Sequence, residues 1–158
     1  MDKRDFVEIN DTYIFFRNFA GKEGPYNRAG DRNFCVAIPV EQAREMEQEG
    51  WNIKWREPRE EGDELKAHIK VSIRFDIFPP TVYQVTSNRK VRLNEKTIEN
   101  LDWADILNVD LALRPYHWEV NGTKGIKAYV KSMYVVIDED GFVDKYSDIP
   151  SDDDYDED

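Results

Sequence analysis

Cationic and aromatic residues recur together in this sequence, and their combination is its first feature with chemical meaning. They form three groups along the chain: Arg17, Lys22, Tyr26, Arg28, Arg32 and Phe34; Lys70, Arg74, Arg89, Lys90 and Arg92; Tyr116, Trp118, Lys124, Lys127, Tyr129 and Lys131. Single-stranded nucleic acid needs this mixture, because cations neutralise phosphates while ring faces accept unstacked bases at about 1–3 kcal/mol per base. Such binding requires no recognition of base sequence.

The candidate nucleic-acid-binding residues come from these groups and from one further pair, Lys54 and Trp55. They are Tyr26, Arg28, Arg32, Lys54, Trp55, Lys70, Arg74, Arg89, Lys90, Arg92, Trp118, Lys124, Lys127, Tyr129 and Lys131. A plainer interpretation stays open for each residue. The rings could be core residues, and the Lys and Arg side chains could form an ordinary solvated face. For any single ring, a place in the core is favoured over nucleic-acid binding. For the cations, neither interpretation is favoured, because they share strand faces with rings.

Residues for catalysis are sparse by comparison. Neither NGTKG nor FAGKEG has the glycine spacing of a Walker phosphate-binding loop, and no serine lies in a nucleophile elbow. Cys35 sits in an apolar run, which favours a small core residue over a nucleophile. Four acids could in principle hold magnesium as in nucleases: Asp102, Asp105, Asp110 and Glu119. We expect no enzyme activity, no cofactor and no metal, since His68 and His117 also lack zinc spacing.

The acidity of the chain is concentrated at its C-terminal end. The chain holds 22 Lys and Arg against 33 Asp and Glu, a net charge of −11. Residues 138–158 hold 11 acids and one base, so residues 1–137 are nearly neutral. We therefore expect a folded domain over 1–137 and a disordered acidic tail over 138–158. The candidate tail residues are Asp148, Asp152, Asp153, Asp154, Tyr155, Asp156, Glu157 and Asp158.

Three roles for this tail are open. It could be a solvated segment that only keeps the protein soluble. It could compete with a polyanion for the cationic surface of the domain and become available to protein partners when nucleic acid displaces it. It could also mimic DNA phosphates and inhibit another DNA-binding protein. The concentration of acids after the last predicted strand favours competition over mimicry.

Strand patterns dominate the domain that must position these residues. In HIKVSIRFDIF, apolar residues alternate with polar ones from Ile69 to Ile77, which predicts a strand with one buried and one mostly basic face. NGTKG predicts a tight hairpin turn between HWEV and IKAYVKSMYVVI. Two short helices are expected, one from Pro39 to Gly50 and one after Asn94 as N-cap. AGKEGPYNRAGDRN reads as a long basic loop, and the whole pattern predicts a small closed barrel.

This combination resembles the single-stranded DNA-binding proteins of bacteriophages. The resemblance rests on the long basic first loop, the alternation HIKVSIRF, the hairpin VDLALRPYHWEVNGTKGIKAYVKSMYVVI and the acidic tail. It implies an oligonucleotide-binding (OB) fold, a five- to six-stranded antiparallel barrel. It also implies that Lys127, Tyr129 and Lys131 lie on one barrel strand near the groove, Lys70 and Arg74 on another, and Arg28 and Arg32 in the first loop.

The resemblance further implies coating of single-stranded DNA during replication or recombination, with proteins of these processes recruited by the tail. Tails in that family often end in an aromatic residue, whereas this chain ends in acids after Tyr155. The alternative function is an acidic DNA mimic that inhibits a host protein. RNA as ligand and a homodimer both stay open, since OB proteins complete their sheets within one chain or between two.

The remaining composition agrees with an intracellular setting. One cysteine excludes an internal disulfide, and about 18 consecutive apolar residues occur nowhere. We expect a cytoplasmic protein without membrane contact, located in the host cytoplasm if a phage encodes it.

Overall fold

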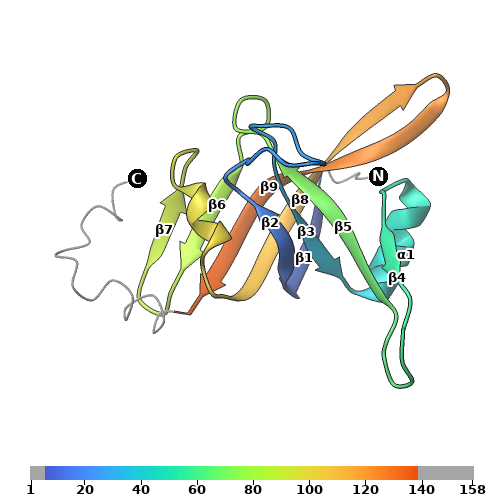
Figure 1. Cartoon of the computed structure of the whole chain (residues 1–158), viewed down its shortest axis with the longest axis horizontal. Helices are drawn as coiled ribbons and strands as arrows, with labels where there is room; N and C mark the ends of the chain where they lie inside the picture. The colour runs from blue at the N-terminus through green and yellow to red at the C-terminus, as the bar shows by residue number, and fades with distance from the viewer. Residues whose placement is uncertain (1–5, 139–158) are drawn as a thin grey trace.

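Strands make up most of the fold. The computed structural model describes residues 6–138. Its elements are β1 (Val7–Thr12), β2 (Ile14–Asn18), β3 (Arg32–Ile38), α1 (Val40–Glu49), β4 (Lys54–Arg56), β5 (Lys66–Ile73), β6 (Thr81–Val85), β7 (Lys90–Leu93), the 3-10 helix η1 (Ile98–Asp102), β8 (Ile106–Val120) and β9 (Thr123–Ile137). α1 lies at one end of a curled sheet and the β6–β7 hairpin at the other (Figure 1). The prediction of a mainly β fold is confirmed.

Six strands form the curled sheet, in the order β1-β8-β9-β5-β3-β2. The two ends of this path, β1 and β2, are separated in the chain by Tyr13 alone. The N-terminal segment thus pairs first with β8 and then, after a bend, with β3. No hydrogen-bonded ladder joins β1 to β2, so the sheet is not closed in the way the sequence suggested.

Two strand pairs differ from the antiparallel prediction. β5 and β6 both pair with β9 in parallel, whereas the other pairs within the described residues are antiparallel. The chain between β5 and β9 is long enough for this crossover, because it contains β6, β7, η1 and β8. The β6–β7 hairpin and the short β4 are additions outside the six-stranded path.

The helix α1 begins after Pro39 and ends at Gly50, as predicted. Gly50 has φ of 111°, and its N–H bonds back to the carbonyl of Glu47, the left-handed ending that glycine adopts without strain. The second predicted helix is a 3-10 turn at Ile98–Asp102. Asn94 still acts before it, since its side-chain oxygen accepts hydrogen bonds from the N–H groups of Lys96 and Thr97.

The alternating pattern of β5 is confirmed up to Ile73. Ala67, Ile69, Val71 and Ile73 are buried, but the strand ends there and Ile77 is exposed. The reason is a turn in which the N–H of Phe78 bonds to the carbonyl of Arg74. The prediction that the strand continues to Ile77 was therefore wrong.

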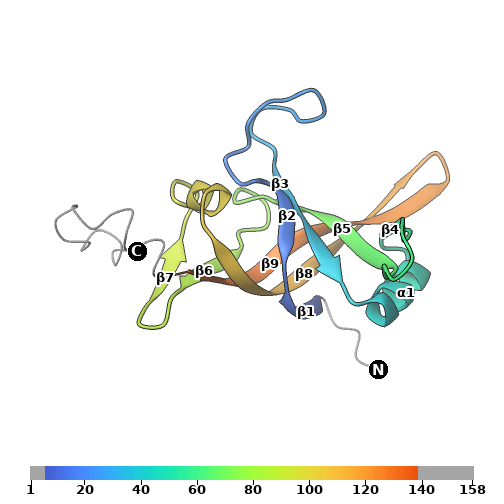
Figure 2. The same ribbon diagram turned by 60° about the horizontal axis from the view of Figure 1, so that its bottom comes forward.

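Two projections frame the outer face of β3 and β5. One is the loop of residues 19–31 between β2 and β3, which we call the first loop, and the other is the tip of the β8–β9 hairpin (Figure 2). The hairpin turns at Asn121 and Gly122, both with positive φ, so the Asn-Gly prediction is confirmed. Phe19 and Phe34 stack at 5.1 Å in the core beneath and connect the base of the first loop to β3.

Candidate nucleic-acid interface

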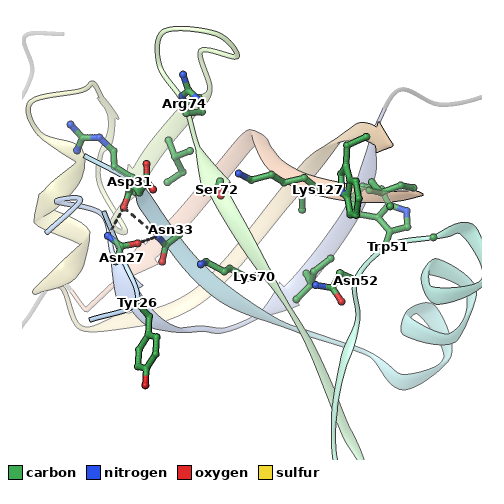
Figure 3. A pocket seen from close by; sticks show the side chains of 18 of the residues that line it. Tyr26, Asn27, Asp31, Asn33, Trp51, Asn52, Lys70, Ser72, Arg74 and Lys127 are labelled. Carbon is green, nitrogen blue, oxygen red and sulfur yellow. Dashed lines mark hydrogen bonds between the residues drawn. The ribbon is translucent and has the colours of Figure 1, made fainter. Parts of the chain in front are cut away.

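A groove crosses the outer face of β3, β5 and β9 between the first loop and the β8–β9 hairpin (Figure 3). It encloses about 640 Å³, and we call it the central groove. The structure brings these sequence-predicted residues to it: Tyr26, Arg28, Arg32, Lys70, Arg74, Trp118, Lys124 and Lys127. Residues from three separate parts of the chain thus line one concave surface.

Two lysines lie next to each other on the floor of the groove. Val71 on β5 is opposite Ala128 on β9, and both face the core. Because side chains alternate along a strand, the preceding residues, Lys70 and Lys127, point outward on neighbouring strands. Neither ammonium forms an ion pair with any residue in the described range 6–138. Both therefore remain available to an anion.

Two exposed rings flank these lysines. Trp118 lies opposite Gly125 in the hairpin, and a Cβ at Gly125 would come within 2.5 Å of the indole Cζ2 atom. Glycine thus lets the indole lie against the backbone, with 37% of the residue left exposed. Tyr26, in the first loop, is 96% exposed. Each ring can offer a free face to an unstacked base.

Asparagine side chains hold the first loop in one conformation. The Asn27 side-chain amide donates to the carbonyls of Lys22, Arg28 and Asp31 at 2.8–3.1 Å. The Asn33 amide donates in turn to Asn27 Oδ1 at 2.7 Å. These bonds order the backbone on either side of Tyr26 before any ligand arrives, which lowers the entropy cost of binding.

Arg32 and Arg74 lie at the same end of the groove, and both already have partners. Arg32 belongs to β3 rather than to the first loop, and its Nη1 donates to the carbonyl of Phe19 at 2.7 Å. Arg74 forms a bidentate salt bridge with Asp76, in which Nε donates to Oδ1 at 2.9 Å and Nη2 donates to Oδ2 at 2.8 Å. The hydrogen bond from Arg74 lowers the pKa of Asp76, because it stabilises the charged carboxylate. A phosphate must therefore compete with Asp76 for Arg74.

Asp76→Asn is expected to strengthen the binding of single-stranded DNA by about threefold at low salt, because it releases Arg74 and removes a negative charge. Fluorescence anisotropy with a labelled oligo-dT measures this change. Glu95→Gln removes one exposed negative charge elsewhere and serves as the matched control. An equal gain in both variants would show that only net charge matters.

Tyr129 and Lys131 require correction. Tyr129 lies on β9 next to Ser72 but is only 6% exposed, because the rings of Phe78 and Tyr116 pack over it at 4.9 and 6.2 Å. It cannot present a face to a base. Lys131 lies at a register shift between β8 and β9, and its ammonium is 4.2 Å from the ring centre of Phe6, outside the groove.

Lys54 and Trp55 lie on β4, at the edge of β5, and do not line the groove. Lys54 is paired with His68, so it shares the outer sheet face with Lys70. Trp55 contacts α1 instead: its Nε1 donates a hydrogen bond to Glu47, and the Arg44 guanidinium lies 5.5 Å from its ring centre.

The predicted residues Arg89, Lys90 and Arg92 belong to the β6–β7 hairpin and are likewise absent from the groove. This hairpin pairs with the C-terminal half of β9, whereas the groove uses the N-terminal half (Figure 1). Lys90 lies 4.7 Å from the ring centre of Tyr83, which itself stacks on Tyr134. The second sequence group is thus divided between two distant surfaces.

Polar groove residues were missed at the sequence level. Asn33 and Ser72 are paired neighbours on β3 and β5, and Asn52 lines the wall next to Trp51. The strand alternation that identified Lys70 as outward-facing also applies to Ser72, so this signal was available. Asn52 follows the end of α1 and had no comparable signal.

Burial changes the proton affinity of two side chains on the outer sheet face. It raises the pKa of the Cys35 thiol, which disfavours a thiolate nucleophile there. It also lowers the pKa of His68, with further lowering by Arg56 and Lys54. His68 is therefore neutral at neutral pH.

The lowered pKa of His68 predicts a pH-dependent stability. The folded protein holds fewer protons at this site than the unfolded chain, so its contribution is present above the unfolded pKa of about 6.5 and is lost as the pH falls toward the folded pKa. We expect the melting temperature to drop between about pH 7.5 and pH 5.5, and His68→Gln to reduce that drop. Identical pH profiles for both proteins in thermal unfolding would contradict this assignment.

Two of the acids considered for magnesium bind backbone groups instead. Asp102 accepts from the N–H groups of Phe19 and Ala20 at 2.7 and 3.0 Å, and Asp110 accepts from that of Asp11 at 2.7 Å. Within the described range, no three His, Cys, Asp or Glu side chains are grouped in a way that could hold a metal ion.

No helix in residues 6–138 is long and apolar enough to cross a membrane. The predicted tail residues from Asp148 onward lie outside the described residues.

The fold is similar to solved structures of one phage protein. It matches the single-stranded DNA-binding protein from bacteriophage Enc34 in complex with ssDNA, with a TM-score of 0.56 and 12% identity over 85% of this chain and 88% of that one. A C-terminal truncation of the Enc34 protein matches with a TM-score of 0.54 and 13% identity, over 85% and 87% of the two chains. These likenesses confirm the OB-like fold.

At the sequence level, no curated protein matches the chain. The model of the phage ssDNA-binding domain family matches residues 2–157. Since this match spans nearly the whole sequence, the chain belongs to the phage ssDNA-binding domain family.

Proposed function

We propose that this protein coats single-stranded DNA through the central groove, with little preference for base sequence. The observation that supports this most directly is the arrangement of Lys70 and Lys127 on the groove floor between the exposed rings of Tyr26 and Trp118. The Enc34 protein of similar fold was solved in complex with ssDNA. Phosphates would follow the lysines, and bases would turn toward the rings.

The charges of the groove set its salt dependence. Besides Arg32, the cations that line the groove are Arg28, Lys70, Arg74, Lys124 and Lys127. A phosphate must compete with Asp31 for Arg28 and with Asp76 for Arg74. If roughly five phosphates are neutralised, the logarithm of the affinity falls with the logarithm of the salt concentration at a slope of about −3.5. Stacking on Tyr26 and Trp118 would add a contribution that depends little on salt.

The test is a titration of labelled oligo-dT and of a matched duplex at several salt concentrations. The proposal expects tight, salt-dependent binding of the single strand and weak binding of the duplex, whose bases are not available to the rings. No binding at low salt would contradict the proposal and favour the DNA-mimic alternative.

We propose that the protein acts by binding alone, in the host cytoplasm. Shortening of the oligonucleotide in magnesium would instead indicate a nuclease.

The acidic tail is proposed to compete with DNA for the same cations. A version of the chain ending at Tyr146 loses all acids from Asp148 to Asp158. We expect it to bind oligo-dT severalfold more tightly than the intact chain at low salt, and the difference to shrink at high salt as charges are screened. Equal affinities of the intact and shortened chains at every salt concentration would contradict this competition. The tail would then serve to recruit replication or recombination proteins, or to keep the protein soluble.

A further inference from the structure

A second cavity of about 690 Å³ lies next to the first loop and adjoins the central groove. Four residues line both spaces: Tyr26, Asn27, Asn33 and Lys70. The second cavity also contains two of the most exposed rings of the described chain, Phe16 at 73% and Trp103 at 66%. We call it the second cavity below.

The exposure of Phe16 results from an unusual backbone. Phe16 has φ of 51°, in the left-handed region that a bulky residue rarely adopts. The pairing of β2 with β3 shifts register between Phe15 and Asn18, so Phe16 sits in a bulge. Bulges re-aim side chains, and such backbone strain tends to persist where a site requires it. The Phe15 ring packs edge-on against Phe16 at 5.0 Å and supports it.

Trp103 is also held in place. It follows η1, and Arg17 Nη1 ties this segment to β2 by donating to the carbonyls of Leu101 and Ala104, both at 2.8 Å. The Asp102 carboxylate also fixes this segment, because it accepts hydrogen bonds from the N–H groups of Phe19 and Ala20 at the start of the first loop. Lys22 Nζ lies 5.4 Å from the centre of the Trp103 ring and places a cation at the same point. Ring and cation are thus positioned before a ligand binds.

We propose that Phe16 and Trp103 form a second base-stacking subsite, through which the single strand continues past Lys70 and beneath Tyr26 out of the central groove. This inference rests on the proposed function and extends its path. Nucleotides fit better than a protein partner, because the cavity shares Lys70 with the groove floor and has Lys22 beside its largest ring. The subsite would lengthen the stretch of DNA that one protein covers.

The test uses the full chain and an oligo-dT series from about 4 to about 16 nucleotides, the range of site sizes seen for OB folds. The double variant Phe16→Asn/Trp103→Ala removes both rings, and asparagine tolerates the positive φ. We expect wild-type affinity for the shortest oligonucleotides that bind and a loss of about tenfold or more for the longest. Trp103→Phe, which keeps a ring, should retain most of the affinity for long strands.

Tyr134→Ala is the matched control, since it removes an exposed ring outside both cavities. Thermal unfolding of each variant checks that the fold is intact. Wild-type affinity of the double variant at every length would overturn the subsite, leave the proposed function standing and make a protein the alternative occupant. An equal loss at every length would also overturn it, since the rings would then act on the central groove. Failure of the wild type to bind any length would overturn both proposals.

Discussion

Replacing Lys70 and Lys127 together with alanine is expected to weaken the binding of single-stranded DNA by about 100-fold at low salt. These two ammonium groups point outward from neighbouring strands at the centre of the groove, and neither has an ion-pair partner within residues 6–138. Each phosphate contact contributes about 0.7 to the salt slope for a single strand, so the slope should fall by about 1.4. Anisotropy titrations of oligo-dT across a salt series measure both quantities.

The chain provides a control with the same change in net charge. Lys90→Ala/Arg92→Ala also removes two exposed cations, but from the β6–β7 hairpin, away from the groove. We expect only a small loss of affinity and an unchanged salt slope for this variant. Equal losses in the two double variants would mean that the DNA responds to overall charge and that the groove has no special role.

The second large effect is expected from Trp118. Trp118→Ala should cost about tenfold or more in affinity, the range found for removal of one base-stacking ring, with little change in salt slope. Trp118→Phe should recover most of the loss, because it keeps a ring face. A loss of affinity without a change in salt slope would show that Trp118 acts by stacking rather than by charge neutralisation.

Gly125→Val tests the role of the Trp118 ring without replacing Trp118 itself. Its side chain would collide with the indole, which lies against Gly125, and would push Trp118 out of position. We expect binding to weaken as in Trp118→Ala while the fold remains intact by thermal unfolding. Wild-type affinity in both variants would exclude Trp118 from the binding surface.

Local patterns predicted the elements that carry the site. Alternation along β5 identified Lys70 as solvent-facing, and Asn121 and Gly122 located the hairpin that carries Trp118. These features depend on neighbours in the sequence, so the sequence contains their signal.

Long-range packing accounts for the features that local patterns did not reveal. Tyr129 follows the alternation of its strand, yet rings from two other segments cover it. Arg74 is paired with Asp76 because the chain turns just after β5. The exposed ring of Phe16 depends on a register shift between β2 and β3, which no local pattern reveals.

Locating the bound strand on the protein tests the central groove as the binding site. An oligo-dT carrying photoreactive thymine analogues would be crosslinked to the intact protein, and the modified residues would be identified by mass spectrometry. We predict crosslinks at Tyr26 and Trp118, the two exposed rings of the central groove. Crosslinks concentrated instead at Tyr83 and Tyr134, on the surface that also carries Lys90, would contradict the central groove as the binding site.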